Sequence, residues 1–478
     1  RSRQKHQKQN HYRIYIQGKT MKMYESDTEF KMQLPGDIQN AIERLKENGF
    51  SAFCVGGSVR DSMLGRTVSD YDMCTDALPE QIISVFGEEN TIPTGIKHGT
   101  VTVKLTFGLC EITTFRCDGE YLDSRHPCEV SFTRNIYEDL KRRDFTVNAM
   151  AYSPKEGLID PFGGKSDLKK GIIRTVGNPD DRFGEDALRI MRAVRFSSQL
   201  SFEIELKTDE SIHRLCSNIG KISVERIFSE LCKTLGGANA KNALDRYRDV
   251  IAVFIPEIKK CFGFDQKSPF HDADVYTHIL RSVDFAPKND TTVRLALFLH
   301  DIAKPVCFTE DESGRRHFMG HAETGAKMAR EILLRLKSSR KTADDVFALI
   351  ENHENFVKPE RAAVLHAASK FGADFLRKLF ILQSADAAAH SPGHTQPRLE
   401  NSLKCIKLLD EAIEKNECFT LSDLKISGNE VKNLVPPDKR FMISRILNKL
   451  LAEVIDEKTE NKPDKLKLRA AEIASGLQ

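Results

Sequence analysis

The stretch that most constrains how this chain can fold is residues 55–76, VGGSVRDSMLGRTVSDYDMCTD. It carries two carboxylates one residue apart, Asp70 and Asp72. Alternate residues of a β-strand point to the same face, so the pattern predicts that these side chains project together from one strand. Two adjacent carboxylates repel each other unless a cation lies between them. Oxygen ligands of this kind suit Mg²⁺, which proteins usually hold with one or two carboxylates plus substrate phosphates.

The glycine pair upstream of these acids indicates a phosphate-binding turn. Gly56 and Gly57 follow an apolar run and precede residues 58–60, the pattern of a strand, a tight turn and the start of a helix. Such a turn lets backbone N–H groups approach a phosphate at the N-terminus of a helix. Either motif alone is weak, because many turns contain glycine and many exposed strands carry alternating acids. Together, with Arg60 and Asp61 between them, they favour a nucleotidyl-transfer site.

Composition places the chain among ordinary globular proteins. Its 478 residues suggest two to four domains, and 40% of the residues are hydrophobic and 29% charged. The net charge of +3 is too small to indicate nucleic-acid binding by itself. No apolar run approaches the length of a membrane span, and the N-terminal segment lacks the apolar core of a signal peptide. The 11 cysteines include no C-x-x-C pair. We therefore expect reduced thiols in a cytoplasmic protein that contacts no membrane.

Residues 1–33 are expected to form a basic N-terminal extension. Residues 1–20 contain six Lys or Arg side chains and no acid. This predicts either a basic arm or a solvated terminus. Met21 and Met23 are both plausible natural starts.

Residues 34–164 are predicted to form a small head domain around the opening stretch. Residues 34–49 show the pattern of an amphipathic helix that ends at a glycine, and residues 79–86 that of a short helix with proline at its start. Residues 98–116 alternate apolar and polar positions on both sides of a turn, which predicts a β-hairpin. Glu111 lies on its second arm. A third carboxylate on a neighbouring strand suits two-metal phosphoryl transfer, and a plain surface glutamate is the alternative.

Two further segments of the head carry polar side chains. Residues 117–127 are polar and rich in turn formers, as in a mobile loop. Arg142, Arg143 and Asp144 stand before an apolar run. Arginine is expected beside a metal-bound triphosphate, because its planar fork matches phosphate oxygens.

Beyond the head the periodicity becomes helical. Residues 180–200 are predicted to form one helix on which polar residues recur every three positions: Asp186, Arg189, Arg192 and Arg195. At 100° per residue these positions form a slowly turning polar stripe. Three arginines on a helix usually just face solvent, but an acid at the head of the stripe suggests recognition of a base.

Asp186 and Arg189 together have the hydrogen-bonding pattern that selects cytosine and adenine. A carboxylate accepts from an exocyclic amino group, and arginine donates to a ring nitrogen or carbonyl. Uracil and guanine place a carbonyl oxygen where the amino group should be, and the carboxylate repels it. The pair would choose C and A without a nucleic-acid template, with Arg192 and Arg195 holding the phosphates or the helix.

The helix expected over residues 222–235 is assigned to packing. Ser223 is its expected cap, apolar residues face inward, and Arg226 and Glu230 face outward. Further on, residues 391–397 have the composition of a linker. The residues after it predict a small helical tail in contact with RNA, with a strand–turn–helix start over residues 421–429.

The middle of the chain carries a second candidate site, whose spacing is typical of HD-type metal phosphohydrolases. The set in chain order is His278, His300, Asp301, His321, His353 and Asp386. An imidazole and a carboxylate adjacent at a helix end can bind one ion, and two of the histidines could serve a second metal. A bound metal would lower the pKa of a water molecule for phosphoester hydrolysis. Each histidine alone is more often a core or surface residue. His271-Asp272 lacks the apolar run that precedes His300, and we discount it.

These motifs resemble a known family. They are Gly56-Gly57-x-x-Arg60-Asp61, Asp70-x-Asp72, Arg143-Asp144 and Glu185-Asp186-x-x-Arg189-x-x-Arg192. The set is similar to bacterial class II CCA-adding tRNA nucleotidyltransferases and their poly(A) polymerase relatives, within the polymerase β-like superfamily. The resemblance covers roughly residues 34–455.

The resemblance implies an α+β fold. A small polymerase β-like nucleotidyltransferase head, with a mixed sheet and helices, would be followed by an all-helical neck, an HD body and a tail. The expected domains are a basic N-terminal extension over residues 1–33, the head over 34–164, a helical neck with the base-selecting helix over 165–262, an HD metal-dependent phosphohydrolase domain over 263–390 and a helical tail that contacts tRNA over 391–478.

The resemblance also implies roles for individual residues. Asp70 and Asp72 would bind Mg²⁺ and, with Glu111 as our third candidate, form the catalytic set. The implied nucleotide-binding residues are Gly57, Arg60, Arg143, Asp186, Arg189, Arg192 and Arg195. For the HD residues we expect a divalent transition metal such as Mn, Ni or Fe.

The expected function is template-independent addition of C, C and A to the tRNA 3′ end from CTP and ATP, with pyrophosphate release, and the HD set leaves a phosphohydrolase activity open. Family members that add only CC shorten the loop over residues 118–126, which is present in full here, so a CC-only enzyme is less expected. The alternatives are addition of A alone or poly(A) tailing, a regulatory HD phosphohydrolase whose head only binds, and an inactive RNA-binding relic. The oligomeric state is left open.

Overall fold

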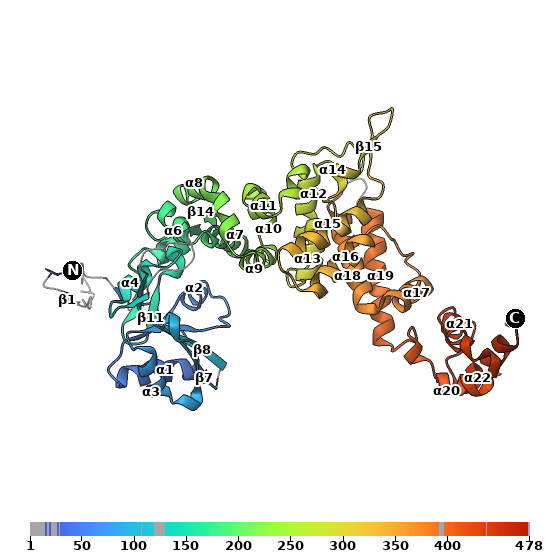
Figure 1. Ribbon diagram of the computed structural model, residues 1–478, viewed down its shortest axis with the longest axis horizontal. Coiled ribbons are helices and arrows are strands. Elements are labelled where there is room, and N and C mark those ends of the chain that lie inside the picture. Colours follow the sequence, from blue (N-terminus) through green and yellow to red (C-terminus); the bar gives the residue numbers. More distant parts are fainter. Residues whose placement is uncertain are drawn as a thin grey trace, which may run out of the picture. The chain divides into compact units, whose positions relative to one another are not determined.

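The structure is a computed structural model that describes residues 15–16, 19–20, 26–27, 29–106, 108–118, 130–391, 396–435 and 437–476. The chain forms two compact units (Figure 1). Unit 1 comprises Arg1–Asn239 and Arg246–Phe254, and unit 2 comprises Ala240–Asp245 and Ile255–Gln478. Among the described residues no helix is long and apolar enough to cross a membrane. Most of the predicted basic arm and of the loop over residues 118–126 lies outside the described residues.

Unit 1 begins with an eight-stranded mixed sheet in the order β3-β12-β11-β4-β5-β8-β7-β6. Its strands are β3 (Ser26–Asp27), β4 (Ala52–Val55), β5 (Asp72–Thr75), β6 (Thr91–Gly95), β7 (Thr100–Leu105), β8 (Gly108–Thr114), β11 (Ala151–Ser153) and β12 (Gly157–Ile159). Neighbours pair antiparallel except β5 and β8, which are parallel. β7 and β8 form the predicted hairpin. Two smaller ribbons pair β1 (Tyr15–Ile16) with β2 (Lys19–Thr20) and β9 (Arg116–Asp118) with β10 (Val130–Phe132).

Short helices accompany this sheet. They are α1 (Gly36–Glu47), α2 (Gly57–Met63), α3 (Pro79–Phe86), α4 (Ile136–Lys141) and α5 (Gly164–Lys170). α1 buries one face, formed by Ile38, Ala41, Ile42 and Leu45. This spacing of three and four residues is that of an amphipathic helix, and the predicted helix is confirmed. α3 begins at Pro79 as expected.

The strand–turn–helix predicted at the glycine pair is present. β4 is buried along its whole length, and α2 starts at Gly57. Gly56 has φ 71° and ψ −129°, a conformation that glycine adopts at low cost. The acid pair differs in part from its prediction. β5 begins at Asp72, and Asp70 precedes the strand, so the expectation that both lie on one strand was wrong for Asp70.

The rest of unit 1 is helical apart from a two-residue parallel ribbon of β13 (Ile172–Ile173) and β14 (Glu203–Ile204). Its helices are α6 (Pro179–Glu185), α7 (Leu188–Leu200), α8 (Leu206–Leu215), α9 (Val224–Leu235) and α11 (Arg248–Phe254). The prediction of one helix over residues 180–200 was wrong. The chain breaks at Asp186, which is extended, with φ −143° and ψ 102°. Its carboxylate accepts the N–H of Leu188 at 3.0 Å and so caps the start of α7.

Unit 2 is helical apart from a small hairpin of β15 (Thr309–Glu310) and β16 (Arg316–His317). Its helices are α10 (Ala240–Arg246, whose last residue belongs to unit 1), α12 (Val275–Phe285), α13 (Thr291–Leu299), α14 (Lys304–Cys307), α15 (His321–Arg335), α16 (Arg340–Glu351), α17 (Arg361–Phe371), α18 (Ala373–Ala388), α19 (Gln396–Glu414), α20 (Gly428–Leu434), α21 (Ile443–Ile455) and α22 (Pro463–Gly476). The mixed sheet followed by helices confirms the predicted α+β class.

The last helices of unit 2 share a buried core with Leu365 of α17 and Ala412 of α19. Val431, Ile446, Leu450, Leu466 and Ala470 from α20, α21 and α22 are buried in it. Of the strand–turn–helix start expected over residues 421–429, the strand was wrong, because Leu421–Asp423 is a 3₁₀ turn. The helix start is present, because α20 begins at Gly428. Capping contacts at Thr420 and Ser427 satisfy the N–H groups of these two turns in place of a strand partner.

Candidate active site and metal centre

An open cleft of about 850 Å³ in unit 1 brings together residues that are far apart in the sequence. Its lining includes every residue predicted for the head site except Glu111. These residues are Gly57, Arg60, Asp70, Asp72, Arg143, Asp186, Arg189, Arg192 and Arg195. The cleft therefore joins the glycine turn and the acid pair to the start of α7.

Three carboxylates lie close together at this cleft. Asp70 and Asp72 are exposed within it, and Glu111 stands beside Asp72 in the parallel register of β5 and β8. Desolvation raises the pKa of Asp72, and the charges of Glu111 and Asp70 raise it further. Carboxylates that repel one another become stable as anions when a cation binds between them. Hard oxygen donors of this kind fit a divalent cation.

Arg60 and Arg143 flank the glycine turn. Arg60 is held by Asp61, with Nε to Oδ1 at 2.9 Å and Nη2 to Oδ2 at 2.8 Å, and by Asn148 at 2.7 Å. Arg143 donates to Asp139 at 3.2 Å, and its buried Nε has no hydrogen-bond partner among the described residues. A Cβ on Gly56 would lie 3.2 Å from Arg143 Nη1. The glycine therefore lets this guanidinium approach the turn at which a phosphate would bind.

Asp186 and Arg189 both lie at the cleft, and both are engaged by other residues. Asp186 Oδ1 accepts the Leu188 N–H, and Oδ2 accepts from Arg226 at 2.9 Å. The Arg189 guanidinium is buried. It pairs with Glu185 and donates to the carbonyl oxygens of Arg182 at 3.0 Å and Arg142 at 3.1 Å. The structure therefore holds both side chains in place at the edge of the cleft.

Arg226 and Glu230 were predicted to face outward on α9, and this was wrong. Glu230 is buried and accepts from Arg195 Nη1 at 3.1 Å. Arg226 is partly buried, lines the cleft and pairs with Asp186. The expected cap residue Ser223 makes no side-chain cap hydrogen bond. The sequence did contain a signal for these two ion pairs. Asp186 and Arg195 on one segment, and Arg226 and Glu230 on the other, are opposite charges that recur at helical spacing.

The second candidate site lies in unit 2, where all six predicted HD residues meet. His300, His321 and His353 share one local arrangement. The Nδ1 atom of each contacts the carbonyl oxygen three residues earlier, at 2.7, 2.7 and 2.6 Å. A ring that donates from Nδ1 to a carbonyl presents the lone pair of Nε2, which is how metal-ligating histidines are usually oriented.

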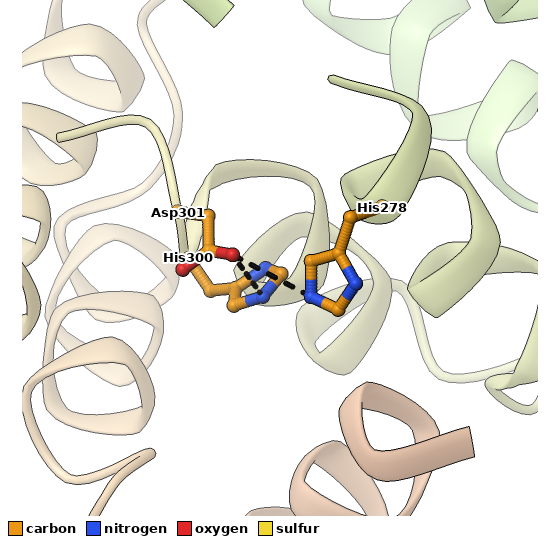
Figure 2. A group of neighbouring side chains, drawn as sticks. All are labelled: His278, His300 and Asp301. Atoms are coloured by element: carbon orange, nitrogen blue, oxygen red, sulfur yellow. Dashed lines mark ion pairs between the residues drawn. The ribbon is translucent and has the colours of Figure 1, made fainter. Parts of the chain in front are cut away.

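The Nε2 atoms converge on Asp301 and Asp386. His300 and His278 approach Asp301 Oδ2 at 3.2 and 3.5 Å, and Figure 2 shows both rings directed toward this carboxylate. His321 approaches Asp301 Oδ1 at 3.4 Å. His278 also contacts Asp386 at 2.8 Å. Two groups of three residues could each hold a metal ion, because the ligand atoms within each group lie within 4.8 Å of one another. The first group is His278, His300 and Asp301, and the second is Asp301, His321 and His353.

This cluster fits metal ions that share Asp301. His300 Nε2 and Asp301 Oδ2 are buried and make no hydrogen bond among the described residues. His321 Nε2 and His353 Nε2 face each other at 3.3 Å, although both rings use Nδ1 toward a carbonyl. Burial opposes charge on His300, but Asp301 and Asp386 raise its pKa to about 10. The carboxylates of Asp301 and Asp386 therefore stabilise a positive charge at the point where the Nε2 atoms meet.

A basic and aromatic rim surrounds this cluster, and most of it was missed from the sequence. It includes the discounted His271 and also Lys304, Arg315, Arg316, His390 and Arg398. The ring centroids of His271 and His278 lie 4.6 Å apart, and burial lowers the pKa of His271 to about 2. Lys304 Nζ lies 2.7 Å from Asp301 Oδ2. Two of these residues could have been found from the sequence: Lys304 follows the His-Asp pair by three residues, and His271 stands in a second His-Asp pair. His390 gave no such signal.

Three family models match separate parts of the chain. The poly A polymerase head domain matches residues 52–174, and the probable RNA and SrmB- binding site of polymerase A matches residues 201–262. The HD domain matches residues 273–412. The first two coincide with the cleft of unit 1 and the helices that follow it, and the third with the histidine cluster.

Several similar proteins are CCA-adding enzymes. The CCA-adding enzyme of Ligilactobacillus salivarius is 50% identical over 222 residues, which is 46% of this chain and 53% of that protein. The match thus spans about half the length of such curated relatives. The crystal structure of the Bacillus stearothermophilus CCA-adding enzyme in complex with CTP is similar over 91% of this chain and 96% of that one, with 29% identity and a TM-score of 0.66.

A third likeness concerns the fold. The Thermotoga maritima CCA-adding enzyme complexed with tRNA is 20% identical over 91% of this chain and 94% of that one, with a TM-score of 0.54. The matches to the head, the RNA-binding segment and the HD domain confirm the resemblance seen in the motifs. The chain therefore matches a poly A polymerase head domain, a polymerase RNA-binding segment and an HD domain, and it is similar to CCA-adding enzymes.

Proposed function

We propose that this chain adds C, C and A to the 3′ end of tRNA from CTP and ATP, without a nucleic-acid template and with release of pyrophosphate. The observation that carries the proposal is the cleft of unit 1. It exposes Asp70 and Asp72, at the start of β5, to the same space as Asp186 and Arg189, at the start of α7. A nucleoside triphosphate has its phosphates at one end and its base at the other, so one nucleotide would engage both pairs.

The residues of the cleft divide the work between the two ends of the nucleotide. Asp70 and Asp72 would hold Mg²⁺, with Glu111 beside them, and the metal when bound would supply charge stabilisation for in-line attack of the 3′ hydroxyl on the α-phosphate. The Gly57 turn, Arg60 and Arg143 would bind the triphosphate through N–H donors.

The opposite end would select the base. Asp186 accepts from the exocyclic amino group of cytosine or adenine, and Arg189 donates to the adjoining ring nitrogen or carbonyl. Arg192 and Arg195 keep α7 in place through Asp144 and Glu230. A uracil or guanine would place a carbonyl oxygen against the Asp186 carboxylate, and the repulsion between the two oxygens would disfavour these bases.

We also propose the partners and the organisation that this activity needs. tRNA, CTP and ATP are the ligands, the protein acts in the cytoplasm, and no membrane is involved. The domains are the extension (1–33), the head (34–164), the neck (165–262), the HD domain (263–390) and the tRNA-contacting tail (391–478).

The direct test supplies the full chain with a tRNA lacking its 3′ CCA and with labelled CTP or ATP alone. We expect CTP alone to extend this tRNA, and ATP alone to extend only a tRNA that already ends in CC. The variant Asp72→Ala should lose both reactions, whereas Glu80→Ala, an exposed acid on α3, should keep them. Incorporation of ATP without any incorporation of CTP would contradict CCA addition and favour A addition or poly(A) tailing.

A second candidate activity is phosphoester hydrolysis at the HD cluster. The observation in its favour is the convergence of four histidines on Asp301 and Asp386. These residues would hold one or two divalent transition metals, of which Mn, Ni and Fe are the candidates, and the metal would supply an activated water. Release of phosphate from a generic phosphoester such as p-nitrophenyl phosphate, lost in His300→Ala, tests it. No release with any of the three metals would contradict it.

A further inference from the structure

The cavity that holds the HD cluster has a volume of about 260 Å³, and Arg315 and Arg398 are part of its lining. Arg315 lies on the turn of the β15–β16 hairpin, and Arg398 lies in the first turn of α19. Neither of these elements carries one of the six predicted metal ligands. Both arginines are exposed, so they stand where the cavity opens to solvent.

Aromatic rings position both guanidinium groups. The Arg315 Cζ atom lies 5.7 Å from the centroid of the Phe270 ring. The Arg398 Cζ atom lies 5.8 Å from the same centroid and 5.2 Å from that of the Phe356 ring. A cation–π contact positions a guanidinium without using its N–H donors. The donors of both arginines therefore stay available to an anion in the cavity.

The hairpin that carries Arg315 is fixed by the next residue, Arg316. The Arg316 Cζ atom lies 4.7 Å from the centroid of the Phe264 ring. Its Nη1 donates to the carbonyl oxygen of Asp265 at 2.5 Å, and its Nε donates to Glu310 at 3.1 Å. These contacts occupy the Arg316 side chain and tie the base of the hairpin to the segment before α12. The turn of the hairpin thereby holds Arg315 against the cavity.

The lining of the cavity carries more cations than acids. Its acids are Asp301, Glu354 and Asp386, and its Lys and Arg side chains are Lys304, Arg315, Arg316 and Arg398. Among the described residues, Arg315 and Arg398 form no ion pair with an acid, whereas Arg316 pairs with Glu310. Burial lowers the pKa of His390 beside the cluster, and the charge of Arg398 contributes to this shift. Any metal ion on the HD ligands adds further positive charge. The cavity should therefore attract an anion, and more strongly the higher the charge of that anion.

Charge and the number of terminal oxygens distinguish phosphate monoesters from diesters. A monoester has three terminal oxygens and carries about two negative charges near neutral pH, because its second pKa is about 6. A diester has one terminal oxygen fewer, a single negative charge and a second organic group in place of that oxygen. Arginine donates to phosphate oxygens through its planar fork. Two arginines in addition to the metal ligands therefore suit the extra oxygen and the extra charge of a monoester.

We propose that Arg315 and Arg398 bind the dianionic phosphate of a monoester beside the HD cluster and so select phosphate monoesters over diesters. The inference rests on the phosphoester hydrolysis proposed for this cluster. In that reaction a water oxygen bonds to phosphorus, the P–O bond to the alcohol breaks, and one proton of the water ends on the alcohol; the products are the alcohol and inorganic phosphate. The arginines donate hydrogen bonds to the substrate and transfer no proton. Their loss should therefore weaken the binding of a monoester more than the reaction of the bound ester.

The test compares the double variant Arg315→Gln/Arg398→Gln with the wild type in the full chain, with Mn²⁺, Ni²⁺ or Fe²⁺ supplied in turn. The substrates are p-nitrophenyl phosphate and its methyl diester, methyl p-nitrophenyl phosphate, which share a leaving group and differ in charge. We expect the wild type to prefer the monoester. In the double variant KM for the monoester should rise about tenfold, with its kcat and the hydrolysis of the diester within about twofold. This is the size expected when hydrogen bonds to a charged group are lost. Arg315→Lys/Arg398→Lys, which keeps both charges, should recover part of the preference.

A second readout measures binding without turnover. Equilibrium dialysis of the metal-loaded protein against radiolabelled inorganic phosphate should show an affinity about tenfold lower in the Gln double variant than in the wild type. Asp301→Ala, which lacks the shared metal ligand, reports the phosphate bound at the cleft of unit 1, and this amount is subtracted. Arg340→Gln is the matched control, because Arg340 is an exposed arginine of α16 that does not line the cavity. It should behave as the wild type in both readouts.

A 5′-phosphorylated oligonucleotide, assayed in the same way, distinguishes a nucleic-acid end from a small ester as the source of the monoester. The inference is overturned if the Gln double variant keeps the wild-type preference and phosphate affinity, if it loses hydrolysis of both esters equally, or if the wild type prefers the diester. A wild type that hydrolyses neither ester with any of the three metals would overturn the proposed hydrolysis. The phosphate affinities would then still decide whether the two arginines bind the anion.

Discussion

Arg192 Nε lies 2.7 Å from Asp144 Oδ2, and this contact joins the residue after the Arg142-Arg143 pair to the middle of α7, 48 positions later. The carboxylate also accepts the Phe145 N–H at 2.8 Å and Asn148 Nδ2 at 3.1 Å. Both partners line the cleft. The pair therefore fixes α7, which carries the proposed base-selecting end of the cleft, against the segment that carries Arg143.

Removing one partner of this pair should destabilise unit 1. Asp144→Ala would leave Arg192 without its carboxylate, and Asp144 itself is buried. Loss of one member of a buried pair costs about 3–5 kcal/mol, and we expect about 2–3 kcal/mol because Arg192 is partly exposed and can be rehydrated. The measurement is the melting temperature. Glu138→Ala, which removes a partly exposed pair with Lys141, should change the free energy of unfolding by less than about 0.5 kcal/mol.

The same pair predicts a dependence of stability on pH. Burial opposes ionisation of Asp144, but Arg192 and Asn148 lower its pKa to about 2, compared with about 3.9 in an unfolded chain. A group with a depressed pKa stabilises the fold above the unfolded value and loses this contribution as the pH falls toward the folded value. About 2 kcal/mol should thus disappear between about pH 4 and pH 2. The stability gap between wild type and Asp144→Asn should narrow over this range, and a constant gap would contradict the assignment.

The two candidate sites should respond to separate substitutions. Asp70→Ala and Asp72→Ala should each lower incorporation of CTP at least 10³-fold, because they remove the acids assigned to the metal, while hydrolysis of a phosphoester is unchanged. His300→Ala should do the reverse. Parallel assays of both activities on each variant make the comparison. If Asp72→Ala lowered both activities, the two sites would not be independent.

Much of the cleft could be predicted from the sequence, because its turns and strands depend on residues that are close together in the chain. Gly56 must adopt a positive φ, Pro79 begins a helix, and Asp72 lies in a strand beside Glu111. The HD residues were likewise recoverable, since the adjacent pair His300-Asp301 follows a buried apolar helix.

The features that could not be predicted depend on contacts between segments that are far apart in the sequence. A polar residue at helical spacing looks the same whether it faces solvent or a partner, and Glu230 was assigned outward because its partner Arg195 is 35 positions away. Asp186 fits the periodicity of a continuous helix, but an aspartate favours a cap where its carboxylate can accept N–H groups. His271 stands near the cluster only because the chain folds back against α12.

Tight packing between α7 and α9 gives a further prediction. Gly237→Ala should cost about 1–3 kcal/mol, because the added Cβ would meet Ser198 Oγ and the backbone of the same residue. The melting temperature measures the loss. Gly220→Ala is the matched control, since no atom lies within 4 Å of its Cβ position, and it should be close to neutral. A neutral Gly237→Ala would mean that the two helices can move apart.

Because Asp301 belongs to both candidate metal-binding groups, the amount of bound metal should depend on which ligand is removed. Asp301 belongs to both groups of ligand atoms, whereas His353 belongs to one. After dialysis against metal and measurement of bound metal by mass spectrometry, Asp301→Ala should therefore lose essentially all metal and His353→Ala about half. His366→Ala changes an exposed histidine of α17 that does not line this cavity, and it should bind metal as the wild type does.

Metal removal should also destabilise unit 2. His321 Nε2 and His353 Nε2 face each other at 3.3 Å. The buried carboxylate of Asp301 and the partly buried carboxylate of Asp386 both approach His300, and Asp301 also pairs with Lys304. A metal bound to the folded state alone stabilises it in proportion to the logarithm of its concentration over Kd. The test removes all metal with a chelator and then adds back Mg²⁺, the metal proposed for the cleft of unit 1. The melting temperature of the wild type should fall and that of Asp301→Ala should not, while incorporation of CTP continues. An equal shift in both proteins would show that the stabilising metal is bound elsewhere.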